Sequence, residues 1–439
     1  MSDRTGVPEI DIVFTMNVLH QRGQLGKLLT LVGELGGLIG DISTDQIGKT
    51  HSHRHITISV FDYDHLREIQ KALSELDFAE LLEVQDLVFE KHKGGKMHYG
   101  RREDVRTVQD LRYIYTPGVA RVCEAIAESE SCAREYTAIP NTVGIFTNGT
   151  RVLGLGDIGP VASLPVMEGK AVIYDQFVGL GAVPILVDTK DPEEFVRTVE
   201  RVAPSFGGVH LEDIRVPDCF YIEDELKKRL DKPVMHDDQH GTGTVVLAAV
   251  MSACRWSGLE PGESVTAAQV GLGAAGFGIA SLLLEWGAKV YGVDPSPEAQ
   301  ARFRSFGGET AELEKALAKA RIVITTTGRV GLIRPDMVRE GQIILALSNP
   351  VPEIEPAAAL AAGAAFAADG KSINNALAYP GLFRAALEFG AKSIDGKMKI
   401  AAAEAISALA EEGELVPGPF DPSVHRDVIA AVERALLPG

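Results

Sequence analysis

Residues 264–294 read SVTAAQVGLGAAGFGIASLLLEWGAKVYGVD. A short apolar run leads into a glycine-rich turn, an apolar helical run follows the turn, and a second strand-like run ends at Asp294. Glycines at this spacing between a strand and a helix predict a dinucleotide-binding turn, because they permit a tight bend and a close approach of the backbone to a pyrophosphate. The predicted cofactor-binding residues of this turn are Gly271, Gly273, Ala274, Ala275 and Gly276.

Asp294 favours NAD as the dinucleotide. Its carboxylate can accept hydrogen bonds from the ribose hydroxyls and would repel a 2′-phosphate. Arg302 and Arg304 follow downstream, so NADP stays open as an alternative.

Two more apolar segments follow, ARIVITTTG at 320–328 and QIILALSNP at 342–350. Each ends in small or polar residues, among them Asn349, as the carboxyl ends of parallel strands do where ligands bind. Asn375 precedes a predicted helix and serves equally well as a helix cap or as a ligand. The pattern predicts an α/β fold whose residues 237–439 form a Rossmann-type, doubly wound parallel sheet with closing helices.

Upstream, two pairs of acids each follow a short apolar run. Glu212 and Asp213 end VHLED, and Asp237 and Asp238 end PVMHDD. We expect Glu212, Asp213 and one acid of the later pair to converge at a sheet edge, where hard oxygen ligands suit Mg²⁺ or Mn²⁺. For any single pair, a solvated strand end or a helix cap is the commoner explanation.

Lys170 and Tyr115 matter only if the fold brings them to this site, since most lysines are surface residues and most such tyrosines serve packing. Pro165 is expected to open a helix, so that Lys170 lies near its N-terminus and loses some preference for its proton. The earlier glycine pattern GLGDIG at 154–159 is discounted as a dinucleotide site, because Pro160 and Pro165 interrupt the helix that should follow it.

Residues 1–92 are expected to form a ferredoxin-like domain, with strands and helices in the order βαββαβ. At RGQLGKLL and GELGGLI this segment resembles the ACT regulatory domain, and Gly23 and Gly26 match that family's turn between the first strand and the first helix. The resemblance implies a small-molecule effector site near Gly23.

Three alternate histidines, His51, His53 and His55, share one face of a predicted strand in this region. They could bind a metal, but a partly exposed strand face is the favoured interpretation, because no acid or cysteine accompanies them in the sequence.

The composition is that of a globular protein of about three domains, with 439 residues and a net charge of −18. Such a charge argues against nucleic acid or an anionic membrane as a partner. The four cysteines lack the spacing of a disulfide scaffold, and the N-terminus lacks the pattern of a signal peptide, so we expect a cytoplasmic protein.

Over roughly residues 108–400 the chain resembles the malic enzymes. The motifs that carry the resemblance stand in that family's order: YTPGVA, GTRVLGLGDIG, PVMEGKAVIYDQF, VHLEDI, VMHDDQHGTG, GLGAAG, LSNP and NNALAYPGLF. The resemblance implies oxidative decarboxylation of (S)-malate to pyruvate and CO₂, with NAD or NADP and a divalent metal. A plain NAD-dependent 2-hydroxy-acid dehydrogenase and an effector sensor on an inactive scaffold are the alternatives.

The same resemblance implies a role for each matching residue. Tyr115 would be the general acid and Lys170 the general base, with Asp237 paired to the lysine. The metal ligands would be Glu212, Asp213 and Asp238; Asn349 and Asn375 would meet cofactor and substrate, and Arg151 would meet the substrate carboxylate. Residues 1–92, 93–236 and 237–439 would be the ACT-like, catalytic and NAD-binding domains of a homodimer or higher homo-oligomer.

Overall fold

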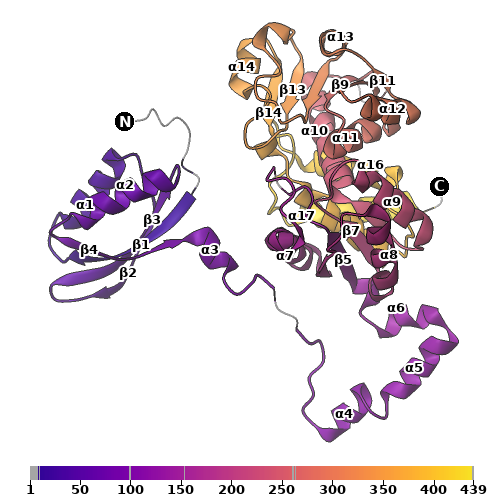
Figure 1. Cartoon of the computed structure of the whole chain (residues 1–439), viewed down its shortest axis with the longest axis horizontal. Coiled ribbons are helices and arrows are strands. Elements are labelled where there is room, and N and C mark those ends of the chain that lie inside the picture. The colour runs from indigo at the N-terminus through magenta and orange to yellow at the C-terminus, as the bar shows by residue number, and fades with distance from the viewer. Residues whose placement is uncertain are drawn as a thin grey trace. The chain divides into compact units, whose positions relative to one another are not determined.

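The computed structural model describes residues 8, 10–97, 100–152, 154–259, 262 and 264–437. The chain divides into two compact units, Met1–His98 and Tyr99–Gly439 (Figure 1). Among the described residues, no helix is both long and apolar enough to span a bilayer.

The first unit is a four-stranded antiparallel sheet with two helices on one face. Its elements are β1 (Ile10–Leu19), α1 (Gln24–Glu34), β2 (Leu38–Ile47), β3 (His51–Val60), α2 (Tyr63–Ser74), β4 (Ala79–Asp86) and α3 (Leu87–His92). The strands lie in the order β2-β3-β1-β4. Apolar residues alternate along β1 and β3 and pack against Leu28 and Val32 of α1 and Leu66 of α2, so the other sheet face carries the polar residues.

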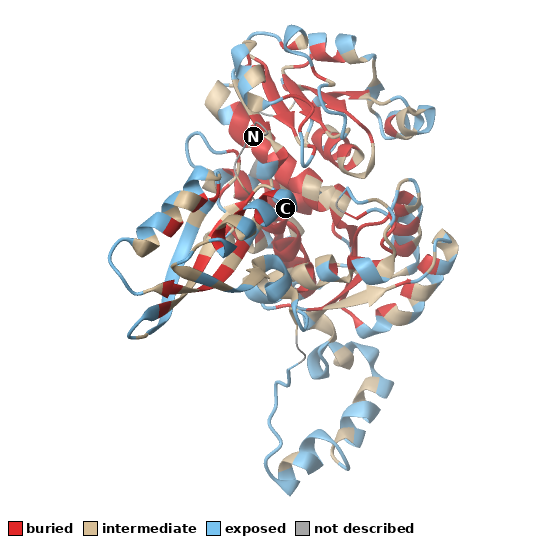
Figure 2. Ribbon diagram, turned by 60° about the vertical axis from the view of Figure 1, so that its left-hand side comes forward, coloured by how far each residue is buried: buried red, intermediate tan, exposed pale blue. Residues whose placement is uncertain are grey.

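The second unit begins with a helical arm. Its helices are α4 (Val108–Ile114), α5 (Val119–Glu128) and α6 (Ala133–Tyr136). Both views show α4 and α5 projecting from the rest of this unit, and neither helix has a buried residue (Figures 1 and 2).

A smaller parallel sheet follows the arm, in the order β6-β5-β7-β8. Its elements are β5 (Thr142–Thr147), α7 (Pro160–Val178), β6 (Gly181–Leu186), α8 (Pro192–Val202), β7 (Gly208–Leu211), α9 (Asp218–Arg229) and β8 (Val234–His236). Phe195 of α8 and Leu226 of α9 share one core with the strand residue Val209.

The helix after GLGDIG begins at Pro160, so the expectation that it opens at Pro165 is wrong. Proline suits the first turn of a helix, where its missing N–H has no intrahelical partner, and Pro160 occupies that position. Pro165 lies inside the helix.

The larger sheet has six strands, every neighbouring pair parallel, in the order β11-β10-β9-β12-β13-β14. Its strands are β9 (Thr266–Val270), β10 (Lys289–Val293), β11 (Glu309–Thr310), β12 (Ile322–Thr325), β13 (Ile343–Ala346) and β14 (Phe366–Asp369). Numbered along the chain, this order is 3-2-1-4-5-6, the arrangement of dinucleotide-binding Rossmann sheets. The prediction of a parallel, Rossmann-type sheet is therefore confirmed.

The remaining helices complete the second unit. They are α10 (Asp237–Ser257), α11 (Ala274–Glu285), α12 (Pro297–Ser305), α13 (Leu313–Lys319), α14 (Pro356–Ala361), α15 (Tyr379–Glu388), α16 (Gly396–Leu409) and α17 (Ser423–Leu436). The helices α10 and α11 cross closely, since a Cβ on Gly243 would lie only 2.9 Å from the Gly278 carbonyl oxygen. The separation of residues 93–236 from 237–439 as two domains stays a prediction.

Candidate active site

Lys170 lies in the middle of the 19-residue helix α7, with its side chain buried between two acids. Its Nζ donates to Asp237 Oδ2 and lies 3.1 Å from Glu212 Oε1. Burial lowers the pKa of Lys170, but Asp237 and Glu212 outweigh that effect and raise it well above its ordinary value. The sequence predicted that Lys170 lies near a helix N-terminus and loses some preference for its proton. Both predictions are wrong, because the helix begins further upstream, at Pro160, and the two acids raise the pKa of Lys170.

Glu212 and Asp213 come directly after β7, where the chain leaves the smaller sheet. Asp213 has a φ of 55°, a left-handed conformation that is uncommon for residues other than glycine. Its backbone N–H donates to Asp238 Oδ2 at 3.0 Å. This hydrogen bond joins the turn after β7 to the first turn of α10, where Asp238 lies.

Glu212, Asp213 and Asp238 each place one carboxylate oxygen within 4.8 Å of the other two. The Oδ2 atom of Asp213 is buried without a hydrogen-bond partner. Three hard oxygen donors at this spacing, one of them unsatisfied, fit a small divalent cation such as Mg²⁺ or Mn²⁺.

The pKa values within the cluster reflect its burial. Burial first, and then the neighbouring carboxylates, raise the pKa of Asp213 to about 9. Burial raises the pKa of Glu212 to about 7, against the opposing effect of Lys170. Burial also acts on Asp238, but the imidazole of His236, whose Nε2 lies 3.2 Å from Asp238 Oδ2, outweighs it and lowers that pKa to about 2. Without a bound cation, Glu212 and Asp213 therefore favour holding protons, whereas Asp238 stays ionised.

Asp237 lies on the first turn of α10, fully buried. Its Oδ2 accepts from Lys170 Nζ and, at 2.7 Å, from Asn375 Nδ2. Its other oxygen, Oδ1, is buried without a partner. Asn375 begins the short turn Asn375–Leu377, which Asn374 caps with its side chain. Asn374 is therefore the capping residue of the two, and Asn375 reaches the lysine–aspartate pair.

A buried histidine and a buried tyrosine, which the sequence patterns did not identify, hold Glu212 in place through a chain of polar contacts. The Tyr174 hydroxyl hydrogen-bonds His210 Nδ1 at 2.9 Å, and His210 Nε2 lies 2.7 Å from Glu212 Oε2. Burial lowers the pKa of His210 to about 3, so it is neutral. The period-two pattern of β7 places His210 and Glu212 on one side, which is the signal that could have found this residue.

A second set of polar contacts holds Asp238 in place. His236 Nε2 lies 3.2 Å from Asp238 Oδ2. The backbone N–H of His236 donates to Glu223 Oε1 at 2.9 Å, and Gln239 Nε2 lies 3.0 Å from His236 Nδ1. These contacts fix the imidazole that orients Asp238.

The glycine-rich turn lines a cavity of about 440 Å³ at the end of β9. Gly271 has a φ of +90°, a Cβ on Gly276 would lie 1.9 Å from the Gly271 carbonyl oxygen, and Gly273 faces open space. Asp294 accepts from the Leu272 N–H at 2.7 Å and lines the same cavity. The three glycines thus provide the turn, the helix contact and the open approach that a bound pyrophosphate needs.

The remaining predicted site residues lie apart from the lysine. Arg151 is exposed, lines the cavity beside Gly271, and joins the acid cluster through its backbone N–H, which donates to the Asp213 carbonyl oxygen at 3.1 Å. Asn349 is exposed just after β13. Tyr115 is the C-cap residue of α4 and is 66% exposed, whereas Lys170 is buried, so the two side chains do not meet within the single chain.

The chain is similar to several known proteins. A family model described as "Malic enzyme, N-terminal domain" matches residues 97–227. NAD-dependent malic enzyme 1 of Bacillus subtilis (strain 168) is 49% identical over 418 residues, which cover 94% of this chain and 95% of that protein. The NAD-dependent malic enzyme of Geobacillus stearothermophilus is 39% identical over 92% of this chain and 89% of its own. The crystal structure of malic enzyme from Pyrococcus horikoshii Ot3 matches with a TM-score of 0.74 and 37% identity, covering 79% of this chain and 89% of that chain.

Proposed function

This chain belongs to the malic enzyme family, and from that premise we propose how its residues carry out the family's reaction. The reaction is the oxidative decarboxylation of malate to pyruvate and CO₂ with reduction of NAD. The observation that carries the proposal is the contact of Lys170 with Asp237 and Glu212, since it joins a proton-transfer group directly to the acid cluster.

The acids Glu212, Asp213 and Asp238 are the proposed ligands of Mg²⁺ or Mn²⁺. Support comes from the spacing of their oxygens and from the unsatisfied Asp213 Oδ2. When bound, the ion would act as a Lewis acid, polarising the C2 oxygen of malate and compensating the charge that develops as CO₂ leaves.

Lys170 is the proposed general base. In its neutral form, which a cation on Glu212 would favour by drawing that carboxylate's charge away from the amine, it would take the C2 hydroxyl proton. The nicotinamide, when bound, would accept the hydride from C2. Asp237 holds the amine in place through its Oδ2, and Asn375 holds that same oxygen from the other side. Glu212 lies against the amine as well, so the charge on Glu212 governs how readily Lys170 gives up its own proton.

Tyr115 is the proposed general acid that protonates C3 after CO₂ has left. This role requires the arm of α4 and α5 to bring the hydroxyl to Lys170, within the same chain or in a second copy of it. Apolar side chains exposed on α4, among them Val108 and Leu111, give the arm a surface that can pack on protein. A homodimer or higher homo-oligomer is therefore part of this proposal.

The cofactor is proposed to bind over Gly271 and Gly273, with Asp294 at the adenosine ribose and Asn349 toward the nicotinamide end. Asp294 supports NAD over NADP, because its carboxylate lines the same cavity, where it would meet the adenosine ribose and repel a 2′-phosphate. Arg151 reaches both the cavity and the acid cluster, which supports a contact with a substrate carboxylate.

The first unit is proposed to be an ACT-like regulatory domain with an effector site near Gly23. The βαββαβ order of this unit and its strand order are those of a ferredoxin-like fold, which supports the assignment. The protein as a whole is proposed to be cytoplasmic. Residues 93–236 and 237–439 would then be the catalytic and NAD-binding domains.

Product identification tests the reaction. The full chain is incubated with malate, Mn²⁺ and NAD or NADP, and the carbon products are followed by NMR. Pyruvate supports the proposal, whereas oxaloacetate as the only product would indicate a plain 2-hydroxy-acid dehydrogenase. No reduction of either cofactor would indicate a sensor on an inactive scaffold.

A further inference from the structure

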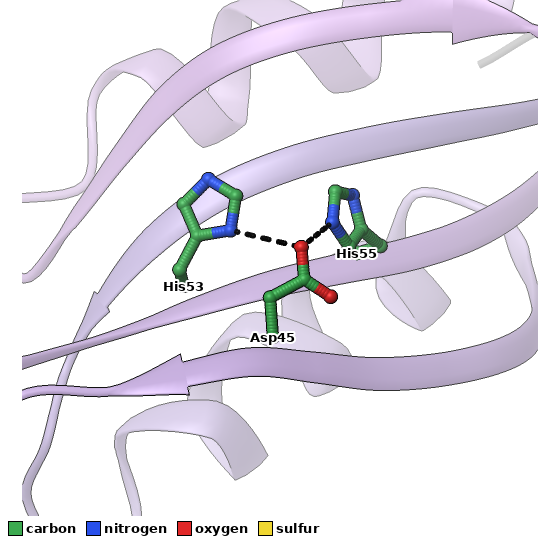
Figure 3. Close-up of side chains that lie close together, drawn as sticks. All are labelled: Asp45, His53 and His55. Atoms are coloured by element: carbon green, nitrogen blue, oxygen red, sulfur yellow. Dashed lines mark hydrogen bonds and ion pairs between the residues drawn. The ribbon is translucent and has the colours of Figure 1, made fainter.

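The open face of the sheet in the first unit carries an acid between two histidines. Asp45 Oδ2 lies 2.5 Å from His55 Nε2 and 3.5 Å from His53 Nδ1 (Figure 3). The sequence alone favours a plain strand face for these histidines, because no acid accompanies them along the chain. The acid comes from the neighbouring strand β2, which the order of residues along β3 does not reveal.

A β-bulge places that acid. Thr44 pairs with Arg54 and Gln46 with His53, so Asp45 is one extra residue of β2 with no partner of its own on β3. A bulge bends its strand and redirects the side chain of the extra residue. Here it aims Asp45 at the space between two histidines that alternate on the same face of β3 (Figure 3).

We propose that Asp45, His53 and His55 form a site for a divalent transition metal of the Zn²⁺ class, separate from the acid cluster of the second unit. One ligand atom from each residue lies within 4.8 Å of the other two. Ligands of a tetrahedral Zn²⁺ lie roughly 3.4 Å apart, given bonds of about 2.0–2.1 Å. The Asp45–His53 separation already has this value, and a small movement of the partly exposed carboxylate opens the Asp45–His55 separation to it.

The neighbours of the site suit a metal. The Thr15 hydroxyl hydrogen-bonds His55 Nδ1 at 2.9 Å. Because a hydroxyl can accept as well as donate, Nδ1 can carry the ring proton, so that the lone pair of Nε2, which faces Asp45, is available to a metal. Arg54, which lies between the histidines in sequence, donates to Thr44 instead of pairing with the acid.

The ligand set selects the class of metal. Two imidazoles and one carboxylate suit Zn²⁺, Co²⁺ or Ni²⁺, whereas carboxylates alone suit Mg²⁺ and Mn²⁺. The side chains of the two histidines are each 32% exposed and that of Asp45 is 56% exposed, so an ion can enter from solvent. Three protein ligands leave a fourth position to water or another small ligand, as in open zinc sites.

Zn²⁺ binding to the untagged full chain tests the proposal, with millimolar Mg²⁺ present to occupy the acid cluster. The test variant is His53→Asn combined with His55→Asn, and the matched control is His51→Asn, an exposed histidine at the start of the same strand. We expect one tight Zn²⁺ per chain in the wild type and in His51→Asn. In the double variant we expect affinity to fall by about 100-fold or more, since even outer-shell changes cost about 10- to 100-fold.

Two further variants separate this site from the catalytic one. Asp45→Asn should weaken Zn²⁺ binding without changing the thermal midpoint of the apoprotein, because all three residues lie on a partly exposed sheet face. Asp238→Asn should leave this Zn²⁺ in place, so the outcome does not depend on the proposed function. The proposal would be overturned if the wild type and the double variant bound Zn²⁺ equally, or if Asp238→Asn removed all of the bound Zn²⁺.

Discussion

The proposed metal sites of the two units differ in burial as well as in their ligands. In the second unit, Glu212 and Asp213 are 4% and 3% exposed. In the first unit, the side chain of Asp45 is 56% exposed. Both clusters take an acid from a point where a strand ends or bulges, so burial sets how their carboxylates titrate, while the residue types set which metal each would hold.

The comparison shows what burial does to a carboxylate. Burial raises the pKa of Asp213 to about 9 and leaves its Oδ2 without a partner. The hydrogen bond from His55 instead lowers the pKa of Asp45, which is satisfied by its own neighbours. A cation or protons must therefore balance the buried carboxylates. On the exposed sheet face, a bound metal would replace the hydrogen bond between His55 and Asp45.

Lys170→Ala should give the largest loss of activity, because it removes the proposed base from the buried cluster. We expect kcat for malate oxidation to fall by on the order of 10²–10⁴-fold, the usual contribution of a positioned acid or base. Steady-state kinetics with malate, NAD and Mn²⁺ measures it. Lys228→Ala, an exposed lysine paired with Glu225, is the matched control. An activity within a few-fold of wild type would contradict the assignment of Lys170.

Tyr115→Phe should separate the two halves of the reaction. Pyruvate formation from malate should fall by roughly 100-fold, while NADH-dependent reduction of added oxaloacetate should change by no more than a few-fold. Tyr115 is exposed in the single chain, so its hydroxyl is not needed for folding. Tyr113→Phe, also exposed on the arm, is the control. Equal losses in both partial reactions would contradict the role of Tyr115 in protonation.

The buried cluster should also make stability depend on pH. Folding raises the pKa of Glu212 to about 7 and that of Asp213 to about 9, above those of the unfolded chain. The stability that these protonated groups contribute is complete below about pH 4 and is lost as pH rises through those two values. In EDTA we therefore expect the thermal midpoint to fall as pH rises from about 6 to about 9.

Mn²⁺ should reverse this trend, because it replaces the protons of the cluster. The rise of the thermal midpoint on adding Mn²⁺ should be a few degrees larger at about pH 8.5 than at about pH 6. Calorimetry of the wild type and of Asp213→Asn provides the check, and the variant should show the flatter profile. A Mn²⁺ effect that does not grow with pH would mean that these carboxylates do not bind the ion.

The sequence predicted the parts of the molecule that lie within one continuous motif. The turn at Gly271 and the parallel strands around it are local patterns, and so are the acid pairs after β7 and β8. The contact of Lys170 with Glu212 arises only when α7 and β7 pack together, and the support from Tyr174 through His210 arises in the same way. Of these contacts, only the placement of His210 beside Glu212 has a signature in the order of residues, the period-two pattern of a strand.

Two further features depend on geometry that a sequence pattern does not encode. Asp45 reaches the histidines because one extra residue bulges out of β2, and no periodic pattern marks that residue. The start of α7 was misplaced because both Pro160 and Pro165 satisfy the same rule for a first turn, and the structure uses the earlier one.

The smallest expected effect tests whether the two clusters act independently. Protein stripped of metals and supplied with Mg²⁺ alone should keep malate turnover within about twofold when His53 and His55 are both changed to Asn, because Mg²⁺ favours carboxylate over imidazole. Steady-state assays at saturating malate measure this. A large loss without Zn²⁺ present would mean that the exposed cluster takes part in the catalytic unit itself.

Mn²⁺ binding measured by electron paramagnetic resonance tests the central claim most directly, that the acids after β7 and β8 hold the catalytic ion. The wild type and Asp238→Asn are titrated with Mn²⁺, with Asp231→Asn, an exposed acid paired with Lys392, as the control. We expect Mn²⁺ affinity and malate turnover to fall together by about 100-fold or more in Asp238→Asn alone. Unchanged Mn²⁺ affinity in Asp238→Asn, or full turnover of the wild type in EDTA, would contradict the claim.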